Sequence, residues 1–441
     1  MKYYIIAGEA SGDLHGSNLI KEIKKLDTDA DIRCWGGDLM QAAGATLVKH
    51  YRDLAFMGFA EVVMNLKTIL ANLKFCKEDI LKFQPDVLVL IDYPGFNLRI
   101  AEWAKKMRSE EPGIRDKELG MRNEKSVMRN EKSVMSDEQR LTTHHSPLIA
   151  KTVFYISPQV WAWKESRVPK MKKNIDRMIV ILPFEKDYYK NKWHWDVDYV
   201  GHPLVQVVEE FKSTVHGRQF TADTQKSIVN SEWSMGENSQ FPIPDSQFQN
   251  LNIIALLPGS RKQEISKKLP VMLEVSKAFP QYQFVVAKAP ALEDAFYENF
   301  MQHYTNVSSV TNRTYELLMQ AKAALVTSGT ATLETALFEV PEVVCYKGSN
   351  ISYQIAKRLI NIKYIALVNL IMDKPVVKEL IQNDLTVENL KHELSLLLFN
   401  EAKQQQLKKD YQDLKDILSG GGNASANAAK IVFDTALPYK A

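Results

Sequence analysis

A carboxylate follows an apolar run in the first half of the chain. Residues 87–91 read Val-Leu-Val-Leu-Ile without alternation, and Asp92-Tyr93-Pro94-Gly95 comes next. Such a run is typical of a parallel strand that is covered on both faces. Ligands of open α/β sheets bind beyond the carboxyl ends of these strands, so Asp92 is a candidate proton acceptor in catalysis. The alternative for this segment alone is that Asp92 caps a turn or a helix.

Three segments rich in glycine and hydroxyl groups also follow expected strands. They are Gly-Glu-Ala-Ser-Gly-Asp at 8–13, Leu-Pro-Gly-Ser-Arg at 257–261 and Ser-Gly-Thr-Ala-Thr-Leu-Glu at 328–334. Glycine lets a ligand approach the backbone, and helix N-terminal amides attract anions. A guanidinium group in the second segment adds a fork that fits phosphate.

These segments supply the candidate binding residues. The first offers Gly8, Ser11, Gly12 and Asp13, but its spacing is not that of a dinucleotide fingerprint. The other two offer Gly259, Ser260, Arg261, Ser328, Gly329, Thr330, Ala331 and Thr332 for a nucleotide diphosphate, with Glu334 as an acceptor for ribose hydroxyls. Ordinary turn formation and helix capping is the alternative for each segment.

Strands and helices must alternate to position these loops. Expected strands are 3–7, 32–35, 87–91, 153–156 and 178–182, then 252–258, 284–287, 323–326 and 342–346, and a helix is expected over 14–25. This alternation predicts βαβ units and parallel sheets. The fold class is therefore α/β, with two Rossmann-like domains that face one another and a helical C-terminal tail.

Length and composition limit the number of domains, the kinds of ligand and the location of the protein. The 441 residues are too many for one ordinary core, and a net charge of +3 makes no general case for nucleic-acid binding. The three cysteines are far apart, which predicts neither a disulfide framework nor a metal site. The N-terminal apolar run is too short for a signal peptide, and no run approaches the roughly 18 residues of a membrane span. We expect a cytoplasmic protein, soluble or peripherally attached to a membrane.

Changes in composition divide the chain. The expected parts are an N-terminal domain at 1–210, a polar linker at 211–250, a C-terminal domain at 251–400 and a helical tail at 401–441 that crosses to the first domain or to a partner subunit. Residues 108–150 are polar and carry a tandem repeat of Met-Arg-Asn-Glu-Lys-Ser-Val, which predicts a disordered insertion.

Two aromatic or apolar segments suit an amphiphilic ligand. Residues 54–75 form either a core helix or a surface helix that takes up acyl chains, through Phe56, Met57, Phe59, Val62, Val63 and Leu66. Residues 157–163, Ser-Pro-Gln-Val-Trp-Ala-Trp, precede several bases. That mixture suits a phosphorylated amphiphile or single-stranded nucleic acid, or it reflects packing at a domain edge.

Together the segments resemble the lipid-A-disaccharide synthase family, inverting glycosyltransferases with a GT-B fold. The motifs that carry the resemblance are GEASGD from Gly8, MGFAEV from Met57, IDYPGFN from Ile91, YISPQVWAWKESRV from Tyr155, LPFEK from Leu182, YVGHPL from Tyr199, LLPGSRKQEI from Leu256, SGTATLE from Ser328, AKRLI from Ala356 and VKELIQ from Val377. They follow the family's order over nearly the whole chain.

The resemblance implies that UDP-2,3-diacylglucosamine reacts with 2,3-diacylglucosamine 1-phosphate. We expect no cofactor or metal, because Arg261 and the helix start at 328–332 can stabilise the leaving diphosphate. The resemblance also implies that Asp92 is the base, that Arg261 and Asn369 contribute to the active site, and that the enzyme works at the cytoplasmic face of the inner membrane. A homodimer that forms through the C-terminal tail is one of the two arrangements expected for that tail. Many members have Asp where Gly95 stands, and the insertion 108–150 is foreign to the usual pattern.

Rival functions remain open at this point. One is another UDP-sugar enzyme of similar shape, such as a UDP-N-acetylglucosamine epimerase or the peptidoglycan glycosyltransferase. The other is a lipid- or nucleotide-binding module without catalysis, which predicts a missing base, whereas Asp92 is present.

Overall fold

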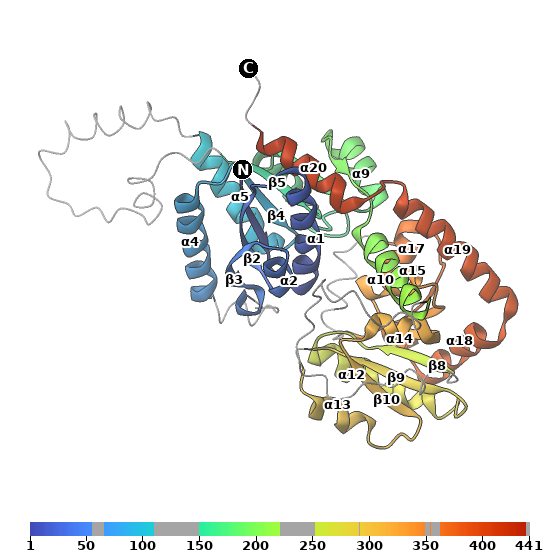
Figure 1. The fold of residues 1–441 in the computed structure, drawn as a ribbon. Helices are drawn as coiled ribbons and strands as arrows, with labels where there is room; N and C mark the ends of the chain where they lie inside the picture. The colour runs from blue at the N-terminus through green and yellow to red at the C-terminus, as the bar shows by residue number, and fades with distance from the viewer. Residues whose placement is uncertain are drawn as a thin grey trace, which may run out of the picture. The chain divides into compact units, whose positions relative to one another are not determined.

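The computed structural model describes residues 1–54, 66–109, 150–220, 252–290, 292–348, 353 and 362–437. It divides into two compact units, one formed by Met1–Pro203 with Gly421–Ala441 and the other by Leu204–Gly420 (Figure 1). Each unit is built on one parallel sheet with helices packed against it, as the alternating sequence pattern predicted.

The first unit contains a seven-stranded sheet in the order β3-β2-β1-β4-β5-β6-β7. Its strands are β1 Lys2–Ala7, β2 Asp31–Gly36, β3 Thr46–His50, β4 Val87–Ile91, β5 Lys151–Tyr155, β6 Arg177–Val180 and β7 Asp198–Tyr199. All neighbouring strands are parallel. The helices are α1 Ala10–Leu26, α2 Asp38–Ala42, α4 Leu66–Phe83, α5 Pro94–Ser109, α8 Val168–Asn174, α9 Pro183–Trp193 and α20 Ala424–Ala436, with short 3₁₀ turns at Tyr51–Leu54 and Glu165–Arg167.

The second unit contains a six-stranded sheet in the order β10-β9-β8-β11-β12-β13. Its strands are β8 Ile253–Leu257, β9 Gln283–Lys288, β10 Val307–Thr311, β11 Ala321–Thr327, β12 Glu342–Tyr346 and β13 Lys378–Ile381. The helices are α10 Pro203–Phe220, α12 Lys262–Ser276, α13 Asp294–Met301, α14 Thr314–Gln320, α15 Thr330–Leu337, α17 Leu367–Met372, α18 Val387–Phe399 and α19 Glu401–Ser419, with a 3₁₀ turn at Gln382–Asp384.

The central strands lie in the middle of each core. Every residue of β4 and β8 is buried, which is why their sequences are apolar without alternation. Four strands that the sequence did not predict, β3, β7, β10 and β13, are the edge strands of the two sheets. All three cysteines are buried and unpaired.

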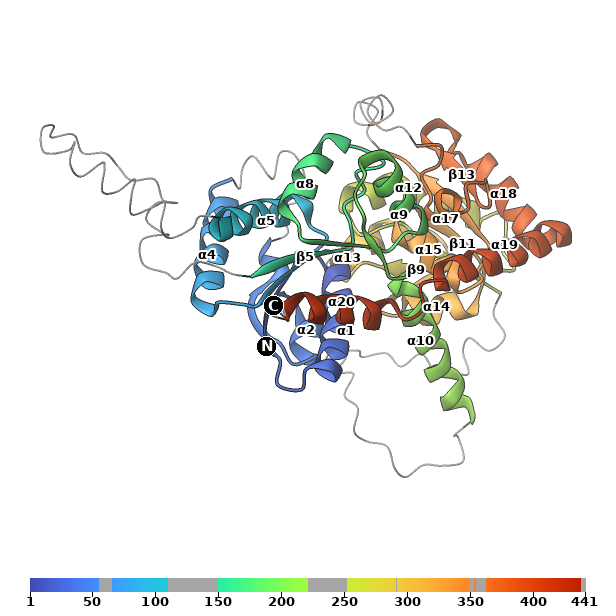
Figure 2. The same cartoon turned by 90° about the horizontal axis from the view of Figure 1, so that it is seen from above.

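The last helix returns to the first unit. Helix α19 ends at Ser419, and after a short link α20 begins at Ala424 and packs beside α1 (Figure 2). The link is tightly packed, because a Cβ built on Gly421 would lie 2.2 Å from the backbone nitrogen of Gly201. Glycine is therefore required where these two segments cross.

Some expectations fall outside the described residues or end elsewhere. The repeat-containing insertion lies almost entirely within 110–149, and half of the apolar segment at 54–75 lies within 55–65, neither of which is described. The linker expected at 211–250 starts before α10 has ended, because this helix continues to Phe220. Phe211 also packs edge-on against Tyr315 and Phe338, with ring centroids 5.4 and 6.1 Å apart. Across the described helices, none is long and apolar enough to span a bilayer.

Candidate active site

In each unit the candidate loops follow the two neighbouring central strands. In the first sheet β1 pairs with β4, and Ala7 is the register partner of Ile91. In the second sheet β8 pairs with β11, and Leu257 is the partner of Val326. These pairs are the points where the strand order reverses, and open α/β sheets bind ligands in the crevice at such points.

Asp92 lies in a strained turn at the first of these points. Asp92 and Tyr93 have φ angles of 43° and 49°, a left-handed conformation that residues other than glycine rarely adopt. The Asp92 backbone N–H donates to the Tyr155 carbonyl at 3.0 Å. The buried Asn97 amide donates to the carbonyls of Asp92 at 2.8 Å and Ile91 at 3.2 Å. Strain that the surroundings hold in place is typical of functional sites.

The environment of Asp92 favours its protonated form. Burial, and then the nearby charge of Glu9, raise the pKa of Asp92 to about 6, against a smaller opposing effect of the Tyr93 backbone N–H. Glu9 is the N-cap residue of α1. A carboxylate with a pKa near 6 is a stronger base than a solvated one and is still ionised at neutral pH.

Glu185 is a third carboxyl group at this end of the sheet. Its side chain is buried at the start of α9, where it accepts hydrogen bonds from Leu182 N at 3.0 Å and Trp161 Nε1 at 3.1 Å. Burial raises the pKa of Glu185 to about 7, and the charge of Asp92 adds to that rise. Sequence reasoning missed Glu185 and Asn97, although a Glu in the first turn after proline is a helix-start signal.

The loop that begins at Gly8 is closely packed. A Cβ built on Gly12 would lie 3.0 Å from the Cβ of Ala7. Asp13 is buried and accepts backbone hydrogen bonds from Gly37 at 2.7 Å, Met40 at 3.0 Å and Leu39 at 3.2 Å, so its carboxylate holds the start of α2. Ser11 is exposed at the first turn of α1.

In the second unit, the two anion-ready loops lead into helices. Gly259, with φ 113°, and exposed Ser260 precede Arg261, the N-cap residue of α12. Gly329, with φ 143°, is the N-cap of α15. The first-turn amides of a helix have no carbonyl partner within the helix, so both starts can bind an anion.

The hydroxyl groups of the second loop have protein partners. Ser328 Oγ donates to the Ile365 carbonyl at 2.9 Å, and Thr332 Oγ1 donates to the Gly329 carbonyl at 2.9 Å. Thr330 is exposed and Ala331 half-buried at the helix start. The backbone of this loop is therefore better placed than the Ser328 and Thr332 hydroxyls to contact a ligand.

Two further candidates are engaged within the fold. The Tyr315 hydroxyl donates to Glu334 at 3.0 Å, and burial raises the pKa of that carboxyl group. Asn369 is buried and donates to the Val377 carbonyl and to Glu379, while it accepts from Val377 N, each at 2.9 Å. This places Asn369 as a brace between α17 and β13.

Glu379, which was not predicted from the sequence, connects that brace to the candidate loop that begins at Ser328. Its carboxylate accepts hydrogen bonds from the backbone nitrogens of Ile365 at 3.1 Å and Ala366 at 2.9 Å, as well as from Asn369. Ser328 binds the carbonyl of Ile365. Glu379 therefore fixes the segment on which Ser328 rests.

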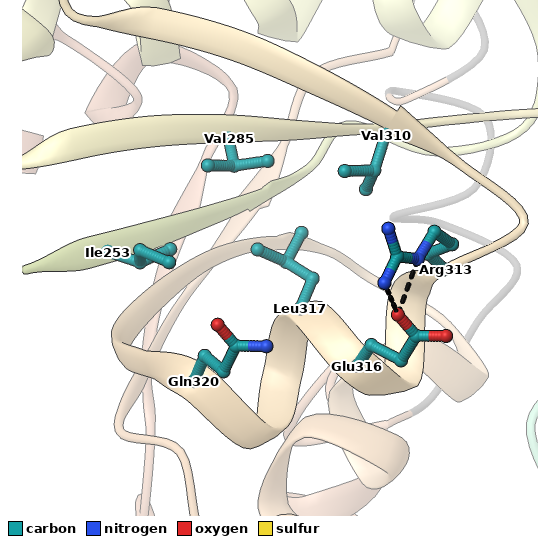
Figure 3. Close-up of a pocket in the computed structure, with 7 residues that line it drawn as sticks. All are labelled: Ile253, Val285, Val310, Arg313, Glu316, Leu317 and Gln320. Atoms are coloured by element: carbon teal, nitrogen blue, oxygen red, sulfur yellow. Dashed lines mark hydrogen bonds and ion pairs between the residues drawn. The ribbon is translucent and has the colours of Figure 1, made fainter. Parts of the chain in front are cut away.

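A small pocket lies elsewhere in the second unit. Figure 3 shows it between α14 and strands β8, β9 and β10, with an ion pair of Arg313 and Glu316 at its rim. Its apolar lining comes from Ile253, Val285, Val310 and Leu317, and Gln320 completes it. Among the described residues, its lining includes none from the loops at 258–261 and 328–332, so it is separate from the candidate nucleotide site.

Sequence comparison decides the family. A family model described as Lipid-A-disaccharide synthetase matches residues 3–114, 142–231 and 242–432. The chain belongs to the lipid-A-disaccharide synthase family. A lipid-A-disaccharide synthase of Trichlorobacter lovleyi is 31% identical over 424 residues, covering 95% of this chain and 93% of that protein. One from Coxiella burnetii is 32% identical over 435 residues, covering 98% and 97%.

Solved structures support the GT-B fold of this synthase family member. A UDP-GlcNAc 2-epimerase from Neisseria meningitidis bound to UDP-GlcNAc superposes with a TM-score of 0.57 at 12% identity, over 99% of both chains. The calicheamicin glycosyltransferase CalG4 gives a TM-score of 0.52 at 15% identity, also over 99% of both. Likeness at this identity concerns the fold alone.

Membership in the lipid-A-disaccharide synthase family makes the protein a glycosyltransferase of lipid A biosynthesis. The expectation drawn from the sequence motifs is thereby confirmed, and the epimerase and non-catalytic alternatives are not favoured. The family match spans both the Asp92 turn and the two loops of the second unit.

Proposed function

We propose that the protein transfers the diacylglucosamine unit of UDP-2,3-diacylglucosamine to 2,3-diacylglucosamine 1-phosphate. The products are UDP and a β-1,6-linked disaccharide 1-phosphate. The observation that carries the mechanism is the strained turn that holds Asp92, with a pKa of about 6, at the switch point of the first sheet.

In this mechanism Asp92 accepts the proton of the acceptor 6-hydroxyl. The oxygen attacks the anomeric carbon of the donor from the face opposite UDP, which inverts the configuration at that carbon. General base catalysis of this kind contributes about 10²–10⁴-fold to the rate. Glu9 supports the role because its charge helps to keep the Asp92 carboxylate basic.

The leaving UDP gains negative charge as the sugar bond breaks. We assign its diphosphate to the backbone of Gly259, Ser260 and Gly329, the first turn of α15 and the guanidinium of Arg261. The exposed Arg261 side chain and the free amides at a helix start support this assignment. Glu334 is the proposed acceptor for ribose, and Tyr315 orients its carboxyl group.

The acyl chains require an apolar surface. We assign them to Phe56, Met57, Phe59, Val62, Val63 and Leu66, and we place the enzyme peripherally at the cytoplasmic face of the inner membrane. Exposed Leu70 and Phe75 on α4, the helix that begins at Leu66, support an apolar surface next to that segment. Each methylene that leaves water contributes about 0.8 kcal/mol.

The decisive experiment uses Asp92→Asn with both lipid substrates. We expect disaccharide formation, read by mass spectrometry, to fall about 10²–10⁴-fold while UDP affinity stays at the wild-type value. Wild-type turnover in Asp92→Asn would remove Asp92 from the role of base. UDP release by the wild-type protein without the acylated acceptor would instead favour an epimerase-like enzyme.

A further inference from the structure

A buried lysine lies beneath both nucleotide loops of the second unit. Lys268, on α12, is 2% exposed, and its ammonium group donates a hydrogen bond to Thr327 Oγ1 at the end of β11. A Cβ built on Gly259 would lie 3.6 Å from Lys268 Nζ and 3.5 Å from Thr327 Cγ2. One ammonium group therefore binds Thr327, the residue before Ser328, and lies beside Gly259 of the other loop.

Lys268 also belongs to a cluster of three charges. Its Nζ lies 3.6 Å from Glu264 Oε2, and Glu264 Oε1 lies 3.4 Å from Arg261. The Arg261 side chain is 60% exposed, whereas that of Lys268 is 3% exposed. Without the lysine, Glu264 would offset the charge of Arg261, so Lys268 leaves the cluster with a net positive charge.

Resting on the proposed function, we propose that Lys268 is a positioning residue of the diphosphate site. It joins the loops at 258–261 and 327–330 and neutralises Glu264, so that the exposed guanidinium of Arg261 is available to phosphate. A buried charge is screened less by water and salt than a surface charge, which makes its field effective at the ligand.

The arrangement explains why an ammonium group is present in this core. An unpaired buried charge is costly, and burial lowers the pKa of Lys268, while Glu264 acts in the opposite direction. Thr327 and Glu264 give the ammonium group its partners. A hydrophobic residue would fill the same space on α12, but it would leave Glu264 facing Arg261 alone.

The test measures the affinities of UDP and uridine by titration calorimetry. We expect Lys268→Met to weaken UDP binding about tenfold, which corresponds to about 1.4 kcal/mol, with little change for uridine. Lys267→Met is the matched control, because Lys267 is exposed on the same helix. The double variant Lys268→Met/Glu264→Gln restores the net charge and should recover most of the UDP affinity.

The outcomes separate this inference from the proposed function. If the wild-type protein does not bind UDP, the nucleotide site itself is wrongly assigned. If the wild type binds UDP, either of two results would exclude Lys268 from diphosphate binding. One is that folded Lys268→Met binds UDP as tightly as the wild type. The other is that its affinity for uridine falls by the same factor as its affinity for UDP. Should Lys268→Met fail to fold, Glu264→Gln alone must tighten UDP binding, and unchanged affinity would overturn the inference.

Discussion

The ring of Tyr93 occupies the space that a side chain at position 8 would need. A Cβ built on Gly8 would lie 2.3 Å from Tyr93 Cγ, a separation at which one of the two must move. Tyr93 follows Asp92 in the left-handed turn, and Gly8 precedes Glu9, so the contact joins the two candidate loops of the first unit. The position of the proposed base therefore depends on the absence of one methyl group.

Gly8→Ala should displace Tyr93 and with it Asp92. We expect the free energy of unfolding to fall by about 1–3 kcal/mol, as overpacking usually causes, and kcat to fall in addition. Gly95→Ala is the control, because a Cβ there meets nothing within 4 Å and the residue is in α5. Its stability should stay the same or rise by up to about 1 kcal/mol, so an equal loss in both variants would contradict the steric argument.

The pH dependence of the reaction should report the environment of Asp92. Because the base must be ionised, kcat/KM should rise with pH through an apparent pKa of about 6. Glu9→Gln removes a charge that raises the pKa of Asp92, so this limb should move to lower pH. Glu22→Gln is the control, since Glu22 lies about 20 Å further along α1. If kcat/KM of Glu9→Gln rises at the same pH as in the wild type, or at a higher pH, the charge of Glu9 does not raise the pKa of Asp92.

Asn369 should behave as a structural brace. Asn369→Ala leaves the backbone N–H and carbonyl of Val377 without their partner, which should lower the free energy of unfolding by about 2–3 kcal/mol. Asn389→Ala, at an exposed amide on α18 that binds the Asp384 carbonyl, should cost less. Thermal unfolding with and without UDP tests this. Unchanged stability with weakened UDP binding would assign Asn369 to the ligand instead.

Glu342 should make the second unit less stable as the pH rises. It is buried at the start of β12, and neither carboxyl oxygen has a hydrogen-bond partner among the described residues. Burial raises the pKa of Glu342 well above its usual value, so the folded chain keeps a proton that the unfolded chain releases above about pH 4.3.

Glu342→Leu should therefore raise the free energy of unfolding at pH 8 by about 1 kcal/mol or more, with a smaller gain at pH 4. Chemical denaturation at both values measures it. Glu298→Leu, at an exposed position on α13, should show no such pH dependence. A gain that is the same at both pH values would mean that ionisation of Glu342 has no part in it.

The sequence predicted the central strands and missed the edges for one physical reason. Strands β4 and β8 are covered on both faces, so every residue is apolar. Edge strands are only partly covered, and their sequences, such as Val-Ser-Ser-Val-Thr in β10 and Lys-Glu-Leu-Ile in β13, lack a continuous apolar run. Such segments cannot be distinguished from loops until their neighbour is known.

Only some residues of the candidate site could be predicted from the sequence. Asp92 and the loops at 258–261 and 328–332 could be named as candidates because each follows a recognisable strand. Glu185, Glu379 and Lys268 could not, because their roles come from partners such as Trp161, Ile365 and Thr327 that lie 24, 14 and 59 residues away. Long-range partners leave no local pattern in a single sequence.

The return of α20 to the first unit has a consequence for synthesis. Its buried residues, among them Ala428 and Val432, complete the packing beside α1, and the helix also packs against β5. A nascent chain therefore exposes this face of its first unit until α20 has been synthesised. The unit whose synthesis starts first is completed only after the second unit has been made, and a stop codon before α20 would damage the part of the protein that carries Asp92.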